Sequence, residues 1–292
     1  MLKVGIIGAG RVGCALAIAL KQKGLVISGV YSKSAESFDF LSKKIYVDCE
    51  NSLTQVVKGS DVIILTVPDD AIGALSYDIA QKSGVIAVKS KIFMHCSGAL
   101  SSDVLENLRL IGAYTGSLHP IQTFADRENG WKDVENIYFG FEGCKEAQKC
   151  AEALVKALKA DMLIIEKKNK PLYHAAACIL SNYMVTLTYI AGEVLEKAGV
   201  ASNKGMKAFM PLLKNTVKNI ECIGSVKALT GPVCRGDVEV IRTHINELND
   251  VIPEVSGLYK VLGLATVDVA LKKASIDEVK VEELKSIFCK SL

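Results

Sequence analysis

The sequence predicts an α/β domain followed by an all-α domain, and three observations support this. An apolar run from Lys3 to Gly8 leads into the glycine-rich turn GAGRVG, residues 8–13. Short apolar runs then alternate with helical patterns, which is typical of α/β proteins. After the polar segment EKKNKP, residues 166–171, strand-like runs become scarce and long helical patterns follow. We therefore expect one domain at 1–167 and a helical domain at 168–292.

The first domain is predicted from its apolar runs, taken in order. The first strand ends at Gly8, a helix runs from Val12 to Lys23, and a second strand spans residues 25–31. The run DVIILTV, residues 61–67, ends at a proline, and two aspartates then open a helix. Further strands are expected at 92–95, 112–118, 137–140 and 162–165, with a helix at 145–159. Continuous apolar strands suit a parallel sheet covered on both faces.

The second domain is expected to contain helices at 172–197, 203–220, 237–249 and 253–273, followed by a final helix. Residues 175–192, AAACILSNYMVTLTYIAG, carry no charge and are long enough to cross a membrane. Polar residues such as Ser181 and Asn182 interrupt them. We therefore expect a buried central helix of a soluble protein, and no membrane partner.

Composition excludes several classes of partner. Of 292 residues, 50% are hydrophobic and 23% are charged, so the chain can bury a large core. The formal charge is +3 and the basic residues are scattered, which argues against nucleic acid. Nine cysteines form no CxxC pair, so we expect reduced thiols and no metal site. The segment MLKVGIIGAG lacks the pattern of a secretory leader, and we expect a cytoplasmic protein.

The turn after the first strand has the GxGxxG spacing of a dinucleotide site. The first glycine permits a tight turn, the second lets the backbone approach a pyrophosphate, and the third allows close packing of helix on strand. The helix N-terminus then faces the anion. The predicted cofactor residues of this turn are Gly8, Ala9, Gly10, Arg11, Val12 and Gly13. The predicted fold is thus an α/β Rossmann dinucleotide-binding domain followed by an all-α C-terminal domain.

The end of the second strand indicates which dinucleotide is bound. NAD-binding proteins usually place a carboxylate there to hold the ribose 2′-hydroxyl. This chain instead has Ser32, Lys33 and Ser34, whose charge and hydroxyls suit a 2′-phosphate, so we expect NADP, as NADPH. The other interpretation is an ordinary surface turn with a solvated lysine. Val67 and Pro68 are expected at the end of their strand, beside the path of the cofactor.

These residues resemble known families. GAGRVG, YSKS and DVIILTVPDDAI, followed by a helical half, resemble the superfamily of 6-phosphogluconate and β-hydroxyacid dehydrogenases, which includes pyrroline-5-carboxylate reductase and prephenate dehydrogenase. HCSGAL (95–100), SLHPIQTF (117–124), YHAAA (173–177) and LTGPVCRGD (229–237) look like an uncharacterised family regarded as NADP-dependent oxidoreductases, with a helical second half of unknown function. That resemblance spans nearly the whole chain and implies no particular substrate.

Two shorter segments resemble characterised relatives. Ser97 and Gly98 are similar to the Ser-Gly of β-hydroxyacid dehydrogenases, whose serine contacts substrate. His119 and Pro120 are similar to the Gly-x-His-Pro of prephenate dehydrogenases, whose histidine hydrogen-bonds the hydroxyl being oxidised. The glycine that follows in those relatives is absent here, so prephenate is not the expected substrate. The catalytic lysine of β-hydroxyacid dehydrogenases has no clear counterpart, because Lys170 is followed by a histidine where an asparagine is usual.

Hydride transfer requires a group near neutral pKa within reach of the reacting oxygen or nitrogen, and histidine suits that task. His119 is the first candidate; alternatively it is a structural histidine of a loop. His174 and Asn182 fall on one sector of an apolar helix, where they either satisfy each other or face substrate. Ser97 either contacts substrate or caps the following helix.

The sequence therefore predicts an NADP(H)-dependent oxidoreductase that acts on a small carbonyl, hydroxy or imine substrate in the interdomain cleft. The resemblance implies that residues 168–292 form a substrate and dimerisation domain, so we expect a homodimer through the helical domain. His119, Ser97, His174 and Asn182 are the predicted catalytic residues. Two alternatives stay open: a non-catalytic NADPH sensor or scaffold, and a deazaflavin-dependent NADP reductase. Arg235 is either a carboxylate clamp or a surface residue, and Asp237 is expected to cap a helix.

Overall fold

The computed structural model describes residues 2–47 and 51–289. These form two compact units, which divide after Ser181. The first unit includes α7 (Lys170–Leu180), and the second begins with α8 (Asn182–Lys197). The expected domain boundary at 167/168 stays a prediction. Each unit is described by itself.

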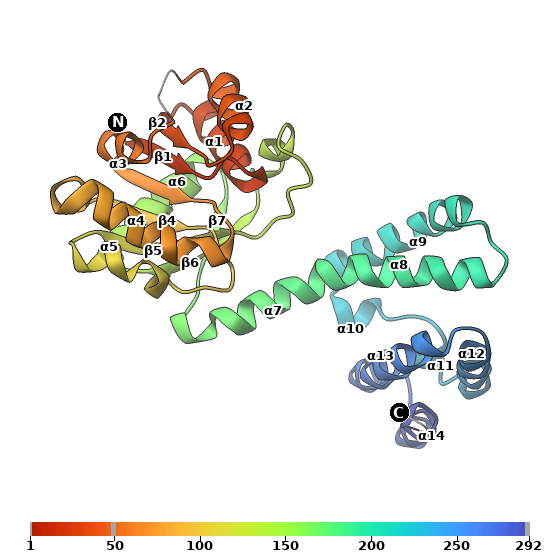
Figure 1. Cartoon of the computed structure of the whole chain (residues 1–292). Helices are drawn as coiled ribbons and strands as arrows, with labels where there is room; N and C mark the ends of the chain where they lie inside the picture. Colours follow the sequence, from red (N-terminus) through yellow and green to blue (C-terminus); the bar gives the residue numbers. More distant parts are fainter. Residues whose placement is uncertain (1, 48–50, 290–292) are drawn as a thin grey trace. The chain divides into compact units, whose positions relative to one another are not determined.

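The first unit, drawn from red to green in Figure 1, is built on a seven-stranded sheet. The order of its strands is β2-β1-β3-β4-β5-β6-β7. The strands are β1 (Lys3–Ile7), β2 (Val26–Tyr31), β3 (Val62–Leu65), β4 (Ile92–His95), β5 (Tyr114–Pro120), β6 (Tyr138–Gly143) and β7 (Asp161–Ile164). All neighbouring strands are parallel except β5 and β6, which are antiparallel. The carboxyl ends of β1 to β5 therefore meet at one edge, where ligands bind in open α/β sheets.

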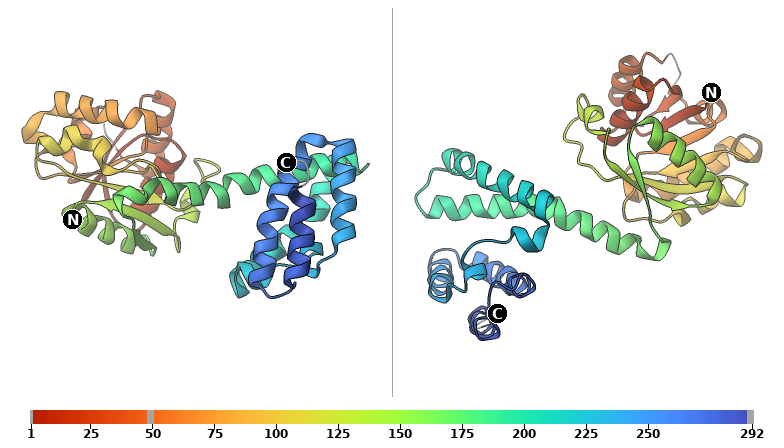
Figure 2. Two further views of the ribbon diagram at one scale, coloured as in Figure 1. Left: turned by 90° about the horizontal axis from the view of Figure 1, so that it is seen from below. Right: turned by 180° about the vertical axis from the view of Figure 1, so that it is seen from behind.

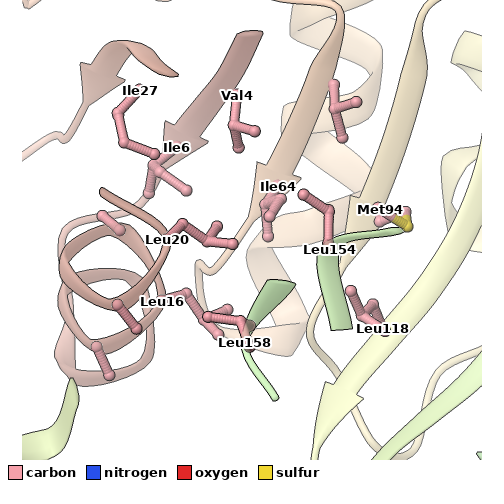
Figure 3. Close-up of a cluster of buried hydrophobic side chains, with 14 of the residues drawn as sticks. Val4, Ile6, Leu16, Leu20, Ile27, Ile64, Met94, Leu118, Leu154 and Leu158 are labelled. Atoms are coloured by element: carbon pink, nitrogen blue, oxygen red, sulfur yellow. The ribbon is translucent and has the colours of Figure 1, made fainter. Parts of the chain in front are cut away.

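Helices cover both faces of this sheet, as Figure 2 shows. They are α1 (Arg11–Gln22), α2 (Ala35–Ile45), α3 (Leu53–Gly59), α4 (Asp69–Val88), α5 (Glu106–Leu110) and α6 (Lys145–Ala157). One buried cluster joins α1, α2 and α6 to the sheet; Leu16, Leu20 and Leu154 lie in it beside Ile6 and Ile64 (Figure 3). A second cluster joins α3, α4 and α5 to the opposite face. The predicted α/β fold of this half is confirmed.

The second unit is helical, as predicted. Its helices are α8, α9 (Ser202–Ile223), α10 (Ser225–Ala228), α11 (Pro232–Arg235), α12 (Val238–Val251), α13 (Pro253–Lys272) and α14 (Glu278–Cys289). A buried cluster holds α11, α12, α13 and α14 together around Phe288 and Ile241. α8 packs along α9, a pair that Figure 1 shows side by side.

The uncharged segment around residue 180 differs from its prediction. The expected helix at 172–197 is two helices, α7 and α8, with a turn at Ser181. Residues 167–197 are long and apolar enough to cross a membrane, a weak indication when it rests on a single helix. The expected burial of residues 175–192 was wrong, because the structure buries none of them within the chain. Its exposed apolar side chains, such as Leu180 and Val185, lack cover in the described structure.

Candidate active site

The glycine-rich turn between β1 and α1 has the geometry that a dinucleotide requires. Gly8 has a φ of +111°, which side-chain-bearing residues rarely adopt. A Cβ at Gly10 would meet no heavy atom of the described residues within 4 Å, so this part of the turn is open to a ligand. A Cβ at Gly13 would overlap the carbonyl oxygen of Gly8. α1 begins at Arg11 without a side-chain cap, which leaves its first N–H groups available to an anion.

Thr66 fastens this turn to the end of β3. Its backbone N–H donates to the carbonyl of Ile7 at 2.8 Å, and its hydroxyl donates to the carbonyl of Gly8 at 2.6 Å. This role was not predicted from the sequence: Thr66 lies within the predicted strand 61–67, whereas β3 ends one residue before it. Val67 and Pro68 follow it and lead into α4, so the structure places both at the expected edge of the sheet.

The three residues expected to hold a 2′-phosphate lie between β2 and α2, beside the glycine-rich turn. The backbone of Ser32 is fixed by Asn51, whose amide accepts from the Ser32 N–H at 3.0 Å and donates to its carbonyl at 2.9 Å. The hydroxyl of Ser34 accepts from the N–H of Ser37 at 3.2 Å and caps α2. Lys33 is exposed. Of the three side chains, that of Lys33 is therefore the most available to a ligand.

Ser97 follows β4 at the same edge, and its hydroxyl is fully used within the protein. It donates to Asp69 at 2.6 Å and accepts from the N–H groups of Ala99 and Leu100 at 3.2 and 3.0 Å. The helix that follows is a short 3₁₀ turn capped by Ser101, so Ser97 is not its cap. These contacts show Ser97 shaping the loop after β4.

His95, which is not among the predicted site residues, binds the same loop through both ring nitrogens. Its ring is fully buried. Nδ1 accepts from the N–H of Ser97 at 3.2 Å, and Nε2 lies 3.1 Å from the carbonyl of Ser101, to which it donates. Burial lowers the pKa of His95 to about 4, so the ring is neutral and the two roles are compatible.

Lys170, the first residue of α7, is also buried, with 2% of its surface exposed. Its ammonium donates to the carbonyl of Ser97 at 3.1 Å and to the hydroxyl of Ser117 at 2.6 Å. Burial lowers the pKa of Lys170, while the nearby charge of Glu142 opposes that shift. Lys170 thus joins α7, β5 and the loop after β4 in one hydrogen-bonded unit.

His119 lies within β5, opposite Gly140 of β6, rather than after the strand as expected. The strand continues to Pro120 because antiparallel pairing with β6 extends it. Nδ1 of His119 is 2.7 Å from the hydroxyl of Tyr173 on α7. Burial lowers the pKa of His119 to about 4, with smaller contributions from His174 and Lys170. His119 is therefore neutral at physiological pH.

His174 and Gly98 complete this cluster. The His174 ring lies edge-on to that of His119, with ring centroids 6.0 Å apart. Its Nδ1 is buried without a hydrogen-bond partner among the described residues, and its Nε2 is 3.6 Å from the thiol of Cys178. A Cβ at Gly98 would lie 2.5 Å from Nδ1 of His174 and 3.0 Å from Nε2 of His119.

The structure thus brings three of the four predicted catalytic residues together in the first unit: Ser97, His119 and His174. Asn182 begins α8 in the second unit. The catalytic roles of all four residues stay predictions, as does the interdomain position of the substrate. Arg235 is exposed and pairs with Asp237, with Nε 2.8 Å from the carboxylate. Asp237 stands at the N-cap position of α12 but makes no side-chain cap there.

Comparisons with known proteins agree with this architecture. The model of the Rossmann-like domain matches residues 1–120, and that of the domain of unknown function DUF2520 matches residues 137–266. No curated protein matches the sequence. Among solved structures, the putative NADP oxidoreductase of Bacteroides fragilis is 25% identical, with a TM-score of 0.74 over 91% of this chain and 98% of that one.

Two more distant structures share the fold. The Plasmodium falciparum pyrroline carboxylate reductase, solved with NADP bound, is 16% identical, with a TM-score of 0.58 over 98% of each chain. The imine reductase of Streptomyces aurantiacus is 12% identical, with a TM-score of 0.60 over 92% of this chain and 98% of that one. These matches agree with the families that the sequence motifs resemble. The chain thus joins a Rossmann-like domain to a DUF2520 domain, in the fold of NADP oxidoreductases.

Proposed function

We propose that this protein is an NADP(H)-dependent oxidoreductase for a small carbonyl, hydroxy or imine substrate. One observation carries the proposal: a neutral, half-buried histidine lies at the same sheet edge as a GxGxxG turn. β1 and β5 are three strand spacings apart, about 14 Å. A dinucleotide along this edge can place its phosphates at the turn and its nicotinamide near His119.

The residues of the site suit this chemistry. A bound nicotinamide supplies or accepts a hydride at carbon. His119 offers a hydrogen bond to the oxygen or nitrogen on which charge develops. Lys170, Ser97 and His95 hold the loop that lies against His119, so they position the site without needing to contact substrate. The oxidoreductase fold of the 25% identical relative supports the same class of reaction.

Replacement of His119 by alanine tests the proposal. Wild-type protein is expected to turn over at least one member of a panel of ketoacids, hydroxyacids and cyclic imines with NADPH or NADP, and His119→Ala is expected to lower kcat/KM at least 100-fold. Absorbance at the nicotinamide band measures the rate, and fluorescence titration checks that NADPH still binds. NADPH binding without turnover of any panel member would instead favour a cofactor sensor.

The choice of NADP over NAD is part of the proposal, and Lys33 tests it. Lys33→Asp is expected to raise the Kd of NADPH about 10- to 100-fold, because a charge-assisted hydrogen bond to the 2′-phosphate is lost. The Kd of NADH should change much less. Lys43→Asp, on an exposed lysine of α2, makes the same charge change and serves as the control. Equal weakening of both cofactors by Lys33→Asp would contradict the assignment.

We also propose that a second copy of this chain covers the apolar surface of α8, giving a soluble homodimer. The chain carries no Asp, Glu, Lys or Arg from residue 171 to 192, so two copies of this surface can pack without burying charge. Val185 is 68% exposed and Tyr189 66% exposed, and α8 buries no residue. A helix with so much exposed apolar surface indicates an interaction site.

Val185→Asp is expected to convert the dimer to a monomer, because the interface would have to bury an unpaired carboxylate. Size-exclusion chromatography with light scattering measures the molar mass. Val279→Asp on α14 is the control, since Val279 is 67% exposed and lies outside the proposed interface. A monomeric wild-type protein would refute the proposed dimer.

A further inference from the structure

We infer that Tyr173 fixes the tautomer of His119, so that Nδ1 accepts a hydrogen bond and Nε2–H is the group offered to substrate. Tyr173 would then be a positioning residue that selects for a substrate atom able to accept a hydrogen bond. The catalytic part of this inference rests on the proposed function. The tautomer itself is a property of the folded chain and can be measured without substrate.

The direction of the hydrogen bond follows from the chemistry of both partners. The 2.7 Å contact joins Nδ1 of His119 to a phenol oxygen. Burial raises the pKa of Tyr173 to about 12 and lowers the pKa of His119 to about 4, so both groups are neutral at physiological pH. A neutral imidazole has one donor and one acceptor nitrogen. Either Tyr173 donates to Nδ1, or Nδ1–H donates to the phenol oxygen.

The surroundings of Tyr173 favour the first arrangement. The contact with His119 is the one hydrogen bond that the described residues give to its hydroxyl. With Tyr173 donating, one group of the pair, the Nε2–H of His119, lacks a partner among the described residues. If Nδ1–H were the donor, two groups would lack one, the phenol proton and the Nε2 lone pair, and an additional unsatisfied group costs about 1–3 kcal/mol. Donation by Tyr173 satisfies its proton and leaves Nδ1 as acceptor. The remaining proton of His119 must then lie on Nε2.

The position of Nε2 shows where that proton is offered. A Cβ at Gly98 would lie 3.0 Å from Nε2, so this nitrogen faces the loop after β4 at a position that has no side chain. The Gly98 position lies beside the carboxyl edge of the sheet. Nε2 of His119 is thus the nitrogen that Tyr173 leaves unoccupied; it faces the loop after β4, next to Nδ1 of His174, and the proposed function places the substrate at this loop.

This arrangement restricts the class of substrate. A neutral imidazole with its proton on Nε2 can polarise a carbonyl by donating to its oxygen. A protonated iminium presents an N–H instead. That donor would face the Nε2–H of His119, and two donors cannot form a hydrogen bond with each other. Within the proposed function we therefore assign a carbonyl, or the hydroxyl formed by its reduction, in preference to a cationic iminium.

Nitrogen NMR of ¹⁵N-histidine protein tests the tautomer directly. Wild-type His119 is expected to show a protonated Nε2 and a hydrogen-bonded Nδ1 between pH 6 and 8; a His119→Gln sample assigns its signals among the four histidines. Tyr173→Phe is expected to move the Nδ1 resonance toward that of an unbonded imidazole nitrogen and to populate the second tautomer. A proton on Nδ1 in the wild type, or unchanged shifts in Tyr173→Phe, would overturn the inference.

The second unit supplies a matched control. Nδ1 of His244 lies 2.8 Å from the hydroxyl of Tyr259, and their ring centroids are 6.0 Å apart, against 5.7 Å for His119 and Tyr173. Tyr259→Phe is expected to change the signals of His244 and to leave those of His119 and the turnover rate unchanged. A response of His119 to Tyr259→Phe would show a global effect and count against the assignment.

Gly140→Ala is a second variant, and it keeps both His119 and Tyr173. A Cβ at Gly140 would overlap the hydroxyl of Tyr173, so the phenol must move away from Nδ1. The expected shifts of His119 are those of Tyr173→Phe. If Tyr173→Phe fails to fold, this variant decides the question, and an unchanged Nδ1 resonance with a displaced phenol would overturn the inference.

Kinetics test the consequence for substrate. Tyr173→Phe is expected to lower kcat/KM for a carbonyl substrate about tenfold, the loss that corresponds to one hydrogen bond, with the Kd of NADPH unchanged. Ketoacids are expected to be reduced faster than cyclic iminium compounds of similar size at pH 7. The reverse preference would overturn the substrate assignment. If no substrate were turned over, the proposed function would be contradicted. The tautomer would still be decided by the nitrogen chemical shifts, which need no substrate.

Discussion

Replacement of Gly13 by alanine is expected to abolish dinucleotide binding and to lower the free energy of unfolding by about 3 kcal/mol. Alanine is the better helix former by about 1 kcal/mol, and Gly13 lies in the first turn of α1. That gain is outweighed because the new Cβ would overlap the carbonyl oxygen of Gly8, a backbone atom that Thr66 holds in place. Chemical denaturation and NADPH titration measure the two effects.

Gly10→Ala separates binding from folding in the same turn. Its Cβ meets no described atom within 4 Å, so the free energy of unfolding should change by less than about 1 kcal/mol. NADPH binding should nevertheless weaken, because the methyl group projects into the open side of the turn where a pyrophosphate would approach. If Gly10→Ala bound NADPH as tightly as wild type, the turn would not be the phosphate site.

Gly98→Ala is expected to lower kcat/KM about 100-fold while the Kd of NADPH stays within a factor of two or so. The added Cβ would lie 2.5 Å from Nδ1 of His174 and 3.0 Å from two ring atoms of His119. Both rings must shift, and a displacement of about 1 Å at a reacting group costs roughly this much. Steady-state kinetics and fluorescence titration provide the two values.

The control for this variant is Gly73→Ala in α4 of the same unit. Its Cβ would lie 3.6 Å from Val104, an ordinary van der Waals contact, and alanine favours the helix. Activity should be unchanged and stability equal or higher. A comparable loss of activity in Gly73→Ala would mean that the effect at Gly98 is not specific to the histidine cluster.

The sheet was predictable because its buried strands are continuous apolar runs. DVIILTV at residues 61–67 and IFMH at residues 92–95 have this pattern, and β3 and β4 lie within them. α2 and α3 were not predicted: α3 is only seven residues long, and α2 buries few of its side chains, Leu41 and Ile45. The burial of residues 175–192 was predicted wrongly, since composition does not show whether the chain itself covers an apolar helix.

The site was predictable only in part. His119 could be selected because a histidine beside a proline follows a strand-like run. Its partner Tyr173 is 54 residues away, and Lys170 is 73 residues from Ser97. Such contacts depend on where α7 packs, and local patterns carry no information about it. The glycine motif, in contrast, acts within one turn, and its residues could be named from spacing alone.

The antiparallel direction of β6 decides which element can reach His119. A parallel successor to β5 would need a crossover connection of a dozen or more residues, usually helical, over one face of the sheet. The reversal instead sets Gly140 beside His119, and the lack of a side chain there leaves room for a phenol ring. Ser117 and His119 are two residues apart on β5 and therefore lie on the same face of the sheet. From α7, Lys170 hydrogen-bonds Ser117 and Tyr173 hydrogen-bonds His119. One reversed strand and one glycine thus let α7 place Lys170 and Tyr173 against β5.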